Sequence, residues 1–120
     1  MEAEQGPRQA LPPIDLDHLG RQTLGDPALR REVLSIFVRE MEAARPRLAG
    51  PQAGGRGELA HRIKGAARGI GAGPVAASAA ALEAEPERIE LAAALIVRMH
   101  EAVRFIVDEG LREGEAKRPG

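Results

Sequence analysis

The chain has 120 residues, enough for one domain with a single core, and its 17 basic and 18 acidic residues leave no basic excess of the kind that a general nucleic-acid binder needs. It contains two aromatic residues and no cysteine, which excludes a base-stacking surface, disulfides and thiol chemistry and fits a reducing compartment such as the cytoplasm. The acidic, proline-containing N-terminus is unlike a secretory signal, and the longest uncharged stretch, residues 69–82, is too short for a membrane span.

Helix-forming residues dominate the sequence, and the alternating runs typical of β-strands are absent. Asp15 is suited to cap a short first helix, and Asp26 followed by Pro27 is a start signal for the second. Pro46 is expected to bend or end that second helix. Glycine and proline divide the remaining chain into three further helices. The five predicted helices cover residues 15–24, 26–48, 57–72, 74–85 and 87–112.

The four longer predicted helices carry apolar residues at helical spacing, so their apolar faces are expected to meet in one core. This pattern predicts an all-α protein, an antiparallel four-helix bundle with a short additional N-terminal helix. The bundle domain is expected to cover residues 14–112, with flexible tails at 1–13 and 113–120. The residues expected to face the core are Leu29, Val33, Ile36, Phe37, Met41, Ala44 and Leu48, then Leu59, Ile63, Ala66, Ala67 and Ile70, then Val75, Ala79 and Leu82, and finally Leu91, Leu95, Met99, Val103, Ile106 and Val107.

The third predicted helix contains the segment AHRIKGAARGIG, residues 60–71, with three glycines, although a glycine inside a helix costs about 1 kcal/mol relative to alanine. At about 100° per residue, His61 lies opposite the apolar face, and Lys64, Gly65 and Arg68 share its exposed side. Gly65, four residues after the histidine, leaves the ring uncovered. An exposed imidazole with open access and nearby cations is suited to accept a phosphoryl group, because its ring nitrogen is a nucleophile and the cations stabilise the added negative charge.

Residues 60–83, AHRIKGAARGIGAGPVAASAAALE, resemble the signature of histidine-containing phosphotransfer (HPt) domains, in which His-x-Leu-Lys-Gly precedes a later glycine and a Leu-Glu pair. The upstream segment, with its Gly-Asp turn and the central phenylalanine of a long helix, is also similar to this family, so the resemblance covers about residues 12–112. The matching residues are His61, Lys64, Gly65, Gly71, Val75, Leu82 and Glu83, with Ile63 in place of leucine and Phe37 as the upstream aromatic residue.

The resemblance implies a free-standing phosphocarrier of two-component signalling without kinase activity of its own. It implies that His61 accepts a phosphoryl group at Nε2 from the aspartate of a receiver domain and passes it to another receiver, with a hybrid histidine kinase also among the partners. Lys64 would support the phosphoryl group electrostatically, and Gly65 would admit the receiver. Any magnesium would be held by the receiver, so no cofactor or metal is expected in this chain, and a monomer fits the family.

By the same resemblance, small side chains around the histidine are candidates for contact with the receiver. These candidates are Ala60, Ala67 and Gly69, together with exposed parts of the second helix. Arg68 stands where many relatives have a small residue, which points to a partner with a more acidic surface.

Three alternatives to phosphotransfer are a metal site, a sensor-kinase dimerisation domain and a helical adaptor. A metal site built from His18, His61 and His100 lacks helical spacing and a recognisable ligand motif. A sensor-kinase dimerisation domain usually has an acidic residue after its histidine, whereas Arg62 follows here. The third alternative is a helical adaptor that binds a receiver or another signalling partner without being phosphorylated, and it would use the same face of the helix.

Overall fold

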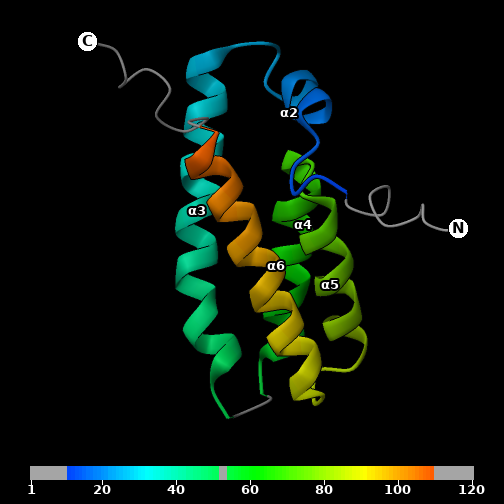
Figure 1. Cartoon of the computed structure of the whole chain (residues 1–120). Helices are drawn as coiled ribbons and strands as arrows, with labels where there is room; N and C mark the ends of the chain where they lie inside the picture. The colour runs from blue at the N-terminus through cyan, green and yellow to red at the C-terminus, as the bar shows by residue number, and fades with distance from the viewer. Residues whose placement is uncertain (1–10, 52–53, 110–120) are drawn as a thin grey trace, which may run out of the picture.

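The computed structural model describes residues 11–51 and 54–109, and the regular secondary structure of these residues is entirely α-helical. Four long helices lie side by side, and the short α2 lies at one end of them (Figure 1). No helix in the described part is long and apolar enough to cross a membrane. The helices are α2 (Leu16–Gln22), α3 (Pro27–Ala49), α4 (Arg56–Ile70), α5 (Gly73–Ala84) and α6 (Ile89–Asp108).

Capping bonds confirm the predicted starts of α2 and α3. The Asp15 carboxylate accepts hydrogen bonds from the backbone N–H groups of Asp17 and His18, both at 3.1 Å. Asp26 caps α3 in the same way, with Pro27 at the first helical position. Asp15 and Asp26 therefore satisfy N–H groups that a helix start leaves without intrahelical partners.

The predicted helix ends lie within two residues of the observed ones, except at the end of α6. The helix α3 continues through Pro46 to Ala49, because Pro46 lies on the water-facing side, where the carbonyl that loses its donor can bond to water. The helix α6 ends at Asp108 rather than at the predicted residue 112, which lies outside the described residues. Of the predicted tails, only residues 11–13 are described, and they have no regular secondary structure.

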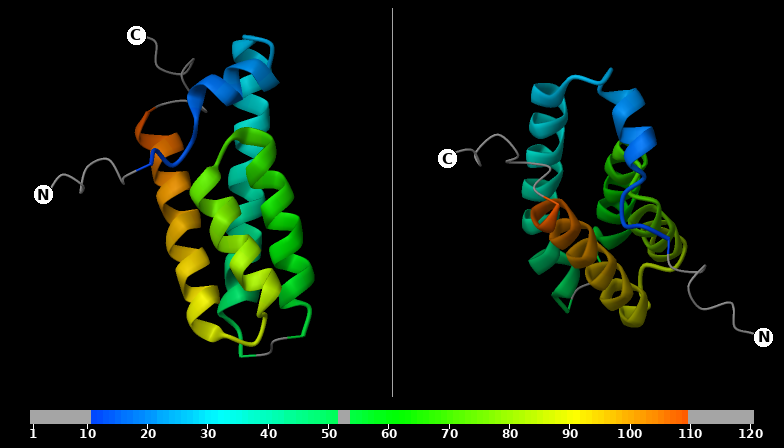
Figure 2. Two further views of the ribbon diagram at one scale, coloured as in Figure 1. Left: turned by 90° about the vertical axis from the view of Figure 1, so that its right-hand side faces the viewer. Right: turned by 45° about the horizontal axis from the view of Figure 1, so that its top comes forward.

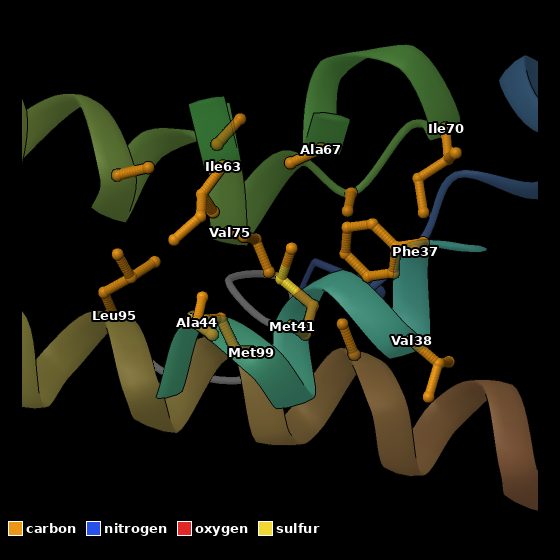
Figure 3. Packing of buried hydrophobic residues seen from close by; sticks show 14 of the residues in the cluster. Phe37, Val38, Met41, Ala44, Ile63, Ala67, Ile70, Val75, Leu95 and Met99 are labelled. Atoms are coloured by element: carbon orange, nitrogen blue, oxygen red, sulfur yellow. The ribbon is translucent and has the colours of Figure 1, made fainter. Parts of the chain in front are cut away.

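The long helices enclose one core. Each helix from α3 to α5 contacts the next along the chain, and α6 closes the ring by contacting α3. Successive helices run in opposite directions, as Figures 1 and 2 show. Figure 3 shows the side chains of α3, α4, α5 and α6 meeting between the helices. Large buried side chains of this core include Phe37, Leu34, Leu48, Val75, Leu82, Leu95 and Ile106.

The predicted core faces of α4 and α5 are largely confirmed, whereas that of α3 is displaced around the helix. Leu34 and Val38 are buried although they were not predicted, while Leu29 and Ile36 are 37% and 41% exposed. On α6, Val107 is 48% exposed instead of buried. Both helices carry more apolar residues than one core face needs, so the spacing alone does not decide which arc is covered.

Two contacts hold α4 in place at its ends. Buried Arg56 donates to the carbonyls of Gly50 at 2.8 Å and Pro86 at 2.9 Å, which ties the start of α4 to two loops. At the other end, Gly71 adopts a φ of +81° and its carbonyl accepts from the N–H of Asp15 at 2.8 Å. These bonds fix both ends of α4, and therefore the position of its exposed middle, relative to the rest of the fold.

Candidate functional site

His61 lies on the water-facing side of α4, and its side chain is 66% exposed. The opposite side of the helix packs into the core through Leu59, Ile63 and Ala67. This arrangement confirms the predicted orientation of His61. Gly65 and Arg68 are exposed on the same side of α4, as predicted.

The His61 ring is held by a carboxylate from the neighbouring helix. Glu83, near the end of α5, lies with Oε2 at 2.8 Å from His61 Nδ1 and with Oε1 at 2.6 Å from Lys64 Nζ. One carboxylate thus bridges the two α4 side chains that the sequence placed three residues apart. The distances are typical of charge-assisted hydrogen bonds.

The charge state of Glu83 defines the hydrogen-bonding state of the ring. The hydrogen bond from Lys64, and secondarily the one with His61, lowers the pKa of Glu83 below its ordinary value of 4.5, so this group is ionised at neutral pH. An ionised carboxylate only accepts hydrogen bonds, so Nδ1 of His61 must carry the proton that it donates. In the neutral imidazole, Nε2 then holds the free lone pair, which makes it the nucleophilic atom of the ring.

Lys64 departs from the prediction that its side chain is exposed. Its side chain is only 18% exposed and reaches into the space between α4 and α5 to contact Glu83. The rotation per residue places Lys64 at the flank of the exposed stripe, and α5 covers that flank. Lys64 is therefore a second partner of the carboxylate beside the histidine, not a free surface cation.

The three glycines of α4 and its end have different surroundings. A side chain at Gly65 or Gly69 would meet nothing within 4 Å, so no contact within the described residues requires glycine there. A Cβ at Gly71 would lie 3.0 Å from the Asp15 carbonyl oxygen, and its φ of +81° is one that other residues rarely adopt. Gly71 is therefore needed by the fold, whereas Gly65, one turn after His61, and Gly69, two turns after it, leave open space on the surface of α4.

The remaining predicted contact residues divide between the surface and the core. Ala60 and Ala67 are fully buried, which corrects the expectation that they face a partner. Arg68 is exposed, but it lines a recess with Asp15 and His18 near α2. The hollow at the histidine, of about 470 Å³, is instead lined by Gly57, Glu58, His61, Arg62 and Glu83.

The other two histidines are remote from this hollow. His18 is half-buried against Gly71, and its Nε2 is buried without a hydrogen-bond partner. His100 is exposed on α6. Within residues 11–51 and 54–109, no three histidine, cysteine, aspartate or glutamate side chains gather as a metal site would require.

The part played by Glu83 was not predicted from the sequence, in which Glu83 is only one half of the Leu-Glu pair that matches the family signature. A signal was available: Glu83 is an acidic residue at the end of an alanine-rich helix, directly after the core residue Leu82. Its approach to His61 nevertheless depends on how α5 packs against α4, which spacing within α5 does not give.

A second missed feature is the apolar surface beside the site. Leu29, Val33 and Ile36 form a partly exposed stripe on α3, on the side of that helix that faces α4. Further along, α3 and α4 border a recess of about 450 Å³ that is lined by Met41, Ala44, Arg47, Leu59, Arg62 and Ala66, among others. Arg62 also lines the hollow at His61, so the recess and that hollow adjoin.

The family model described as Hpt domain matches residues 32–104, which is more than half of the 120-residue chain. The matched range contains all of α4 and α5 and therefore His61, Lys64 and Glu83. No curated protein and no solved structure matches the chain in the corresponding comparisons.

Proposed function

This chain belongs to the Hpt domain family, which takes part in histidine phosphotransfer in phosphorelay signalling, and we propose that its phosphoryl-accepting atom is Nε2 of His61. The phosphoryl group comes from the aspartate of one receiver domain and passes to the aspartate of another. The observation that carries this proposal is the Glu83 contact at Nδ1, which leaves the exposed Nε2 as the nucleophile. The protein is a phosphocarrier and depends on a hybrid histidine kinase for its phosphate.

In the transfer step, the Nε2 lone pair attacks the phosphorus of the receiver's aspartyl phosphate. The N–P bond forms as the O–P bond of the acyl phosphate breaks, and the aspartate leaves as a carboxylate. The ring keeps its Nδ1 proton and becomes positively charged, so no proton has to be released. Glu83 accepts the hydrogen bond from that proton and stabilises the developing charge. The reverse reaction delivers the phosphoryl group to the next receiver.

Lys64 acts in this mechanism mainly through Glu83. Its ammonium group, 2.6 Å from the carboxylate, keeps Glu83 ionised and fixes its position. The same positive charge also stabilises the negatively charged phosphoryl group on His61, one helical turn away from Lys64. Lys64 thus still has the electrostatic role that its spacing predicts, but it acts mainly on Glu83 and only secondarily on the phosphoryl group.

The receiver approaches over Gly65 and Gly69. No side chain projects from α4 at Gly65, next to the ring, or at Gly69, one turn further along. The recess between α3 and α4 adjoins this surface on the side of the stripe that contains Ile36. An aspartyl phosphate can reach Nε2 only if the two backbones come close, which large side chains at these positions would prevent. Arg62 and Arg68 make this face favourable for an acidic partner.

The wider features of the proposal follow from the same observations. The closed order of α3, α4, α5 and α6, with alternating directions, supports the antiparallel four-helix bundle. Magnesium, where the reaction needs it, is supplied with the receiver's acidic pocket. A cytoplasmic location is proposed because the receivers and the kinase domain that supply phosphate work there.

The proposal is tested by incubating the chain with a phosphorylated receiver domain, with the His61→Gln variant in parallel. Phosphate on the wild type alone, labile to acid and stable to base, is the expected result for a phosphohistidine. A variant that still receives label would place the acceptor elsewhere. If the two proteins bind the receiver equally and neither receives label from any of several receivers, the helical adaptor is the better description.

A further inference from the structure

The last helix, α6, carries two apolar stripes, and only one of them faces the core. The core stripe consists of Ala92, Leu95, Met99, Ala102 and Ile106. A second stripe repeats at alternating spacings of four and three residues, the spacing of a coiled-coil seam. We call this stripe the outer seam; its members are Ile89, Ala93, Ile96, His100, Val103 and Val107.

The outer seam is largely open to water. Ile89 and Val107, at its two ends, are 53% and 48% exposed, and Val97 beside its centre is 50% exposed. Ile96 and Val103 are partly covered by the core. A surface helix of a bundle needs only one apolar stripe, and a second one at heptad spacing is typical of a helix that packs against a further helix.

The seam borders a groove that suits a helical partner. In Figure 1, α6 lies beside α3, and a hollow of about 700 Å³ is lined by residues of both helices. The α3 side of this groove carries Glu42 and Arg45 around Met41. Its α6 side is mainly apolar, and its lining residues are Ile96, Val97, Met99, His100, Glu101 and Val103.

We propose that the outer seam is a self-association surface on which α6 of a second copy packs in the antiparallel direction. In this register, residues of the two stripes pair in layers whose residue numbers have a constant sum. Ala93 then meets the partner's Val103, His100 meets the partner's Ile96, and Val107 meets the partner's Ile89. Each layer occurs twice by symmetry, so all members of the seam are covered, and His100, the polar member, packs against an aliphatic side chain.

Charge complementarity favours a second copy in this direction. The residues that follow Ile89, Ile96 and Val103 flank the seam on its open side, and they are Glu90, Val97 and Arg104. In the antiparallel register, Glu90 faces the partner's Arg104, and the two Val97 side chains meet at the two-fold axis. A parallel register would stack His100 on itself and would bring Glu90 and Arg104 opposite core residues, with no ion pair.

The charged residues are available for this exchange. Glu90 now contacts Arg88 at 2.6 Å, and Arg104 contacts Asp108 at 3.6 Å. Both pairs lie at the surface, the first between the residue before α6 and its first turn and the second within α6, and exposed ion pairs of this kind contribute little to stability. Pairing with a second copy therefore gives up little and adds two symmetric pairs.

The association leaves both phosphoryl-accepting histidines free. The α3–α6 groove is on the side of the bundle away from the α4–α5 contact that holds His61 and Glu83. A dimer formed there presents two histidines outwards and replaces the monomer expected from the family resemblance. The inference does not depend on phosphotransfer, because it concerns only the mass and register of the unphosphorylated chain.

The absence of native cysteine allows a site-specific test of the register. Val97→Cys, on the proposed two-fold axis, is treated with a short bis-maleimide linker, and Ala94→Cys, exposed on another side of α6, is the matched control. Efficient cross-linking of the first variant and not of the second is expected. Equal cross-linking of both, or of neither, would contradict the proposal.

A charge-reversal series then tests the partner. Sedimentation of the wild-type chain up to about 1 mM is expected to show a monomer–dimer equilibrium. Glu90→Arg and Arg104→Glu are each expected to weaken it about tenfold, and the double variant to restore it, with circular dichroism confirming that all are folded. A wild type that remains monomeric throughout, or a double variant as weak as the single ones, would overturn the proposal.

Discussion

Gly65 and Gly71 lie six residues apart at the same helix, yet the fold requires only Gly71. Gly71 ends α4 in a left-handed conformation and lies so close to the Asp15 carbonyl that a side chain would not fit. Gly65 has ordinary helical surroundings and open space where a side chain would be. Folding requires glycine at position 71, whereas the glycine at position 65 is a cost to folding that only an outside partner explains.

The largest effect is expected at Gly65. Gly65→Leu should keep the helix intact or strengthen it, because leucine is a better helix former, but the added side chain would keep the receiver away from His61. A misplacement of about 1 Å can reduce a reaction about 100-fold, so transfer from a phosphorylated receiver should fall by at least about that factor. Transfer at the normal rate by a folded variant would show that the access argument is wrong.

The opposite pattern is expected at Gly71. Gly71→Ala should lower the free energy of unfolding by about 2 kcal/mol, because alanine is strained at this φ and crowds Asp15. The control is Gly65→Ala, which should raise the free energy of unfolding by up to about 1 kcal/mol. Urea denaturation measures both. If the two substitutions changed stability in the same direction, the contrast between the glycines would not hold.

A smaller effect on transfer is expected at Glu83. Glu83→Gln keeps an acceptor for Nδ1 but removes the negative charge, so the transfer rate should fall about tenfold. Glu85→Gln, on an exposed acid two residues further along, is the control and should leave the rate unchanged. Single-turnover kinetics with one receiver measures the transfer rates of the two variants and the wild type. Equal rates for Glu83→Gln and the wild type would show that Glu83 has no role in the transfer step.

Lys64→Ala is expected to act more weakly than Glu83→Gln. The substitution removes one of the two partners of Glu83 but leaves the bond to His61, so transfer should slow by about threefold. Loss of the partly buried stem should cost about 1 kcal/mol of stability. Combining the two substitutions should give little more than Glu83→Gln alone, since Lys64 works through that carboxylate; additive effects would indicate direct contact with the phosphoryl group.

The smallest effect concerns stability as a function of pH. The pKa of Glu83 is lower in the folded chain than its ordinary value of 4.5, so its pairing stabilises the fold above pH 4.5 and this contribution is lost as the pH falls below that value. The difference in stability between the wild type and Glu83→Gln should therefore be constant near neutral pH and shrink in acid. A difference that grew on acidification would contradict the assigned direction.

The sequence predicted those features that depend on local chemistry. Asp15, Asp26 and Pro27 marked helix starts correctly, and the rotation along α4 placed His61 on the exposed side. These results follow from a capping bond or from a single helix turned about its own axis.

Features that depend on neighbouring helices were not predicted. Leu34 and Leu29 are equally apolar, and only the position of the other helices decides that the first is buried and the second exposed. Lys64 was predicted to be exposed because the sequence does not show where α5 lies relative to α4. The contact of Glu83 with His61 and Lys64 was not predicted for the same reason. The contact between α4 and α5 thus contains the information that spacing within one helix lacks.

The protonation state of the His61 ring decides the proposed mechanism, and nitrogen-15 NMR of the labelled chain measures it directly. The proposed bond to Glu83 predicts that the neutral ring carries its proton on Nδ1, and that phosphorylation by a receiver modifies Nε2. In Glu83→Gln the preference for this tautomer should weaken. A wild-type ring protonated on Nε2, or a phosphoryl group on Nδ1, would contradict the assignment of Glu83 and the mechanism built on it.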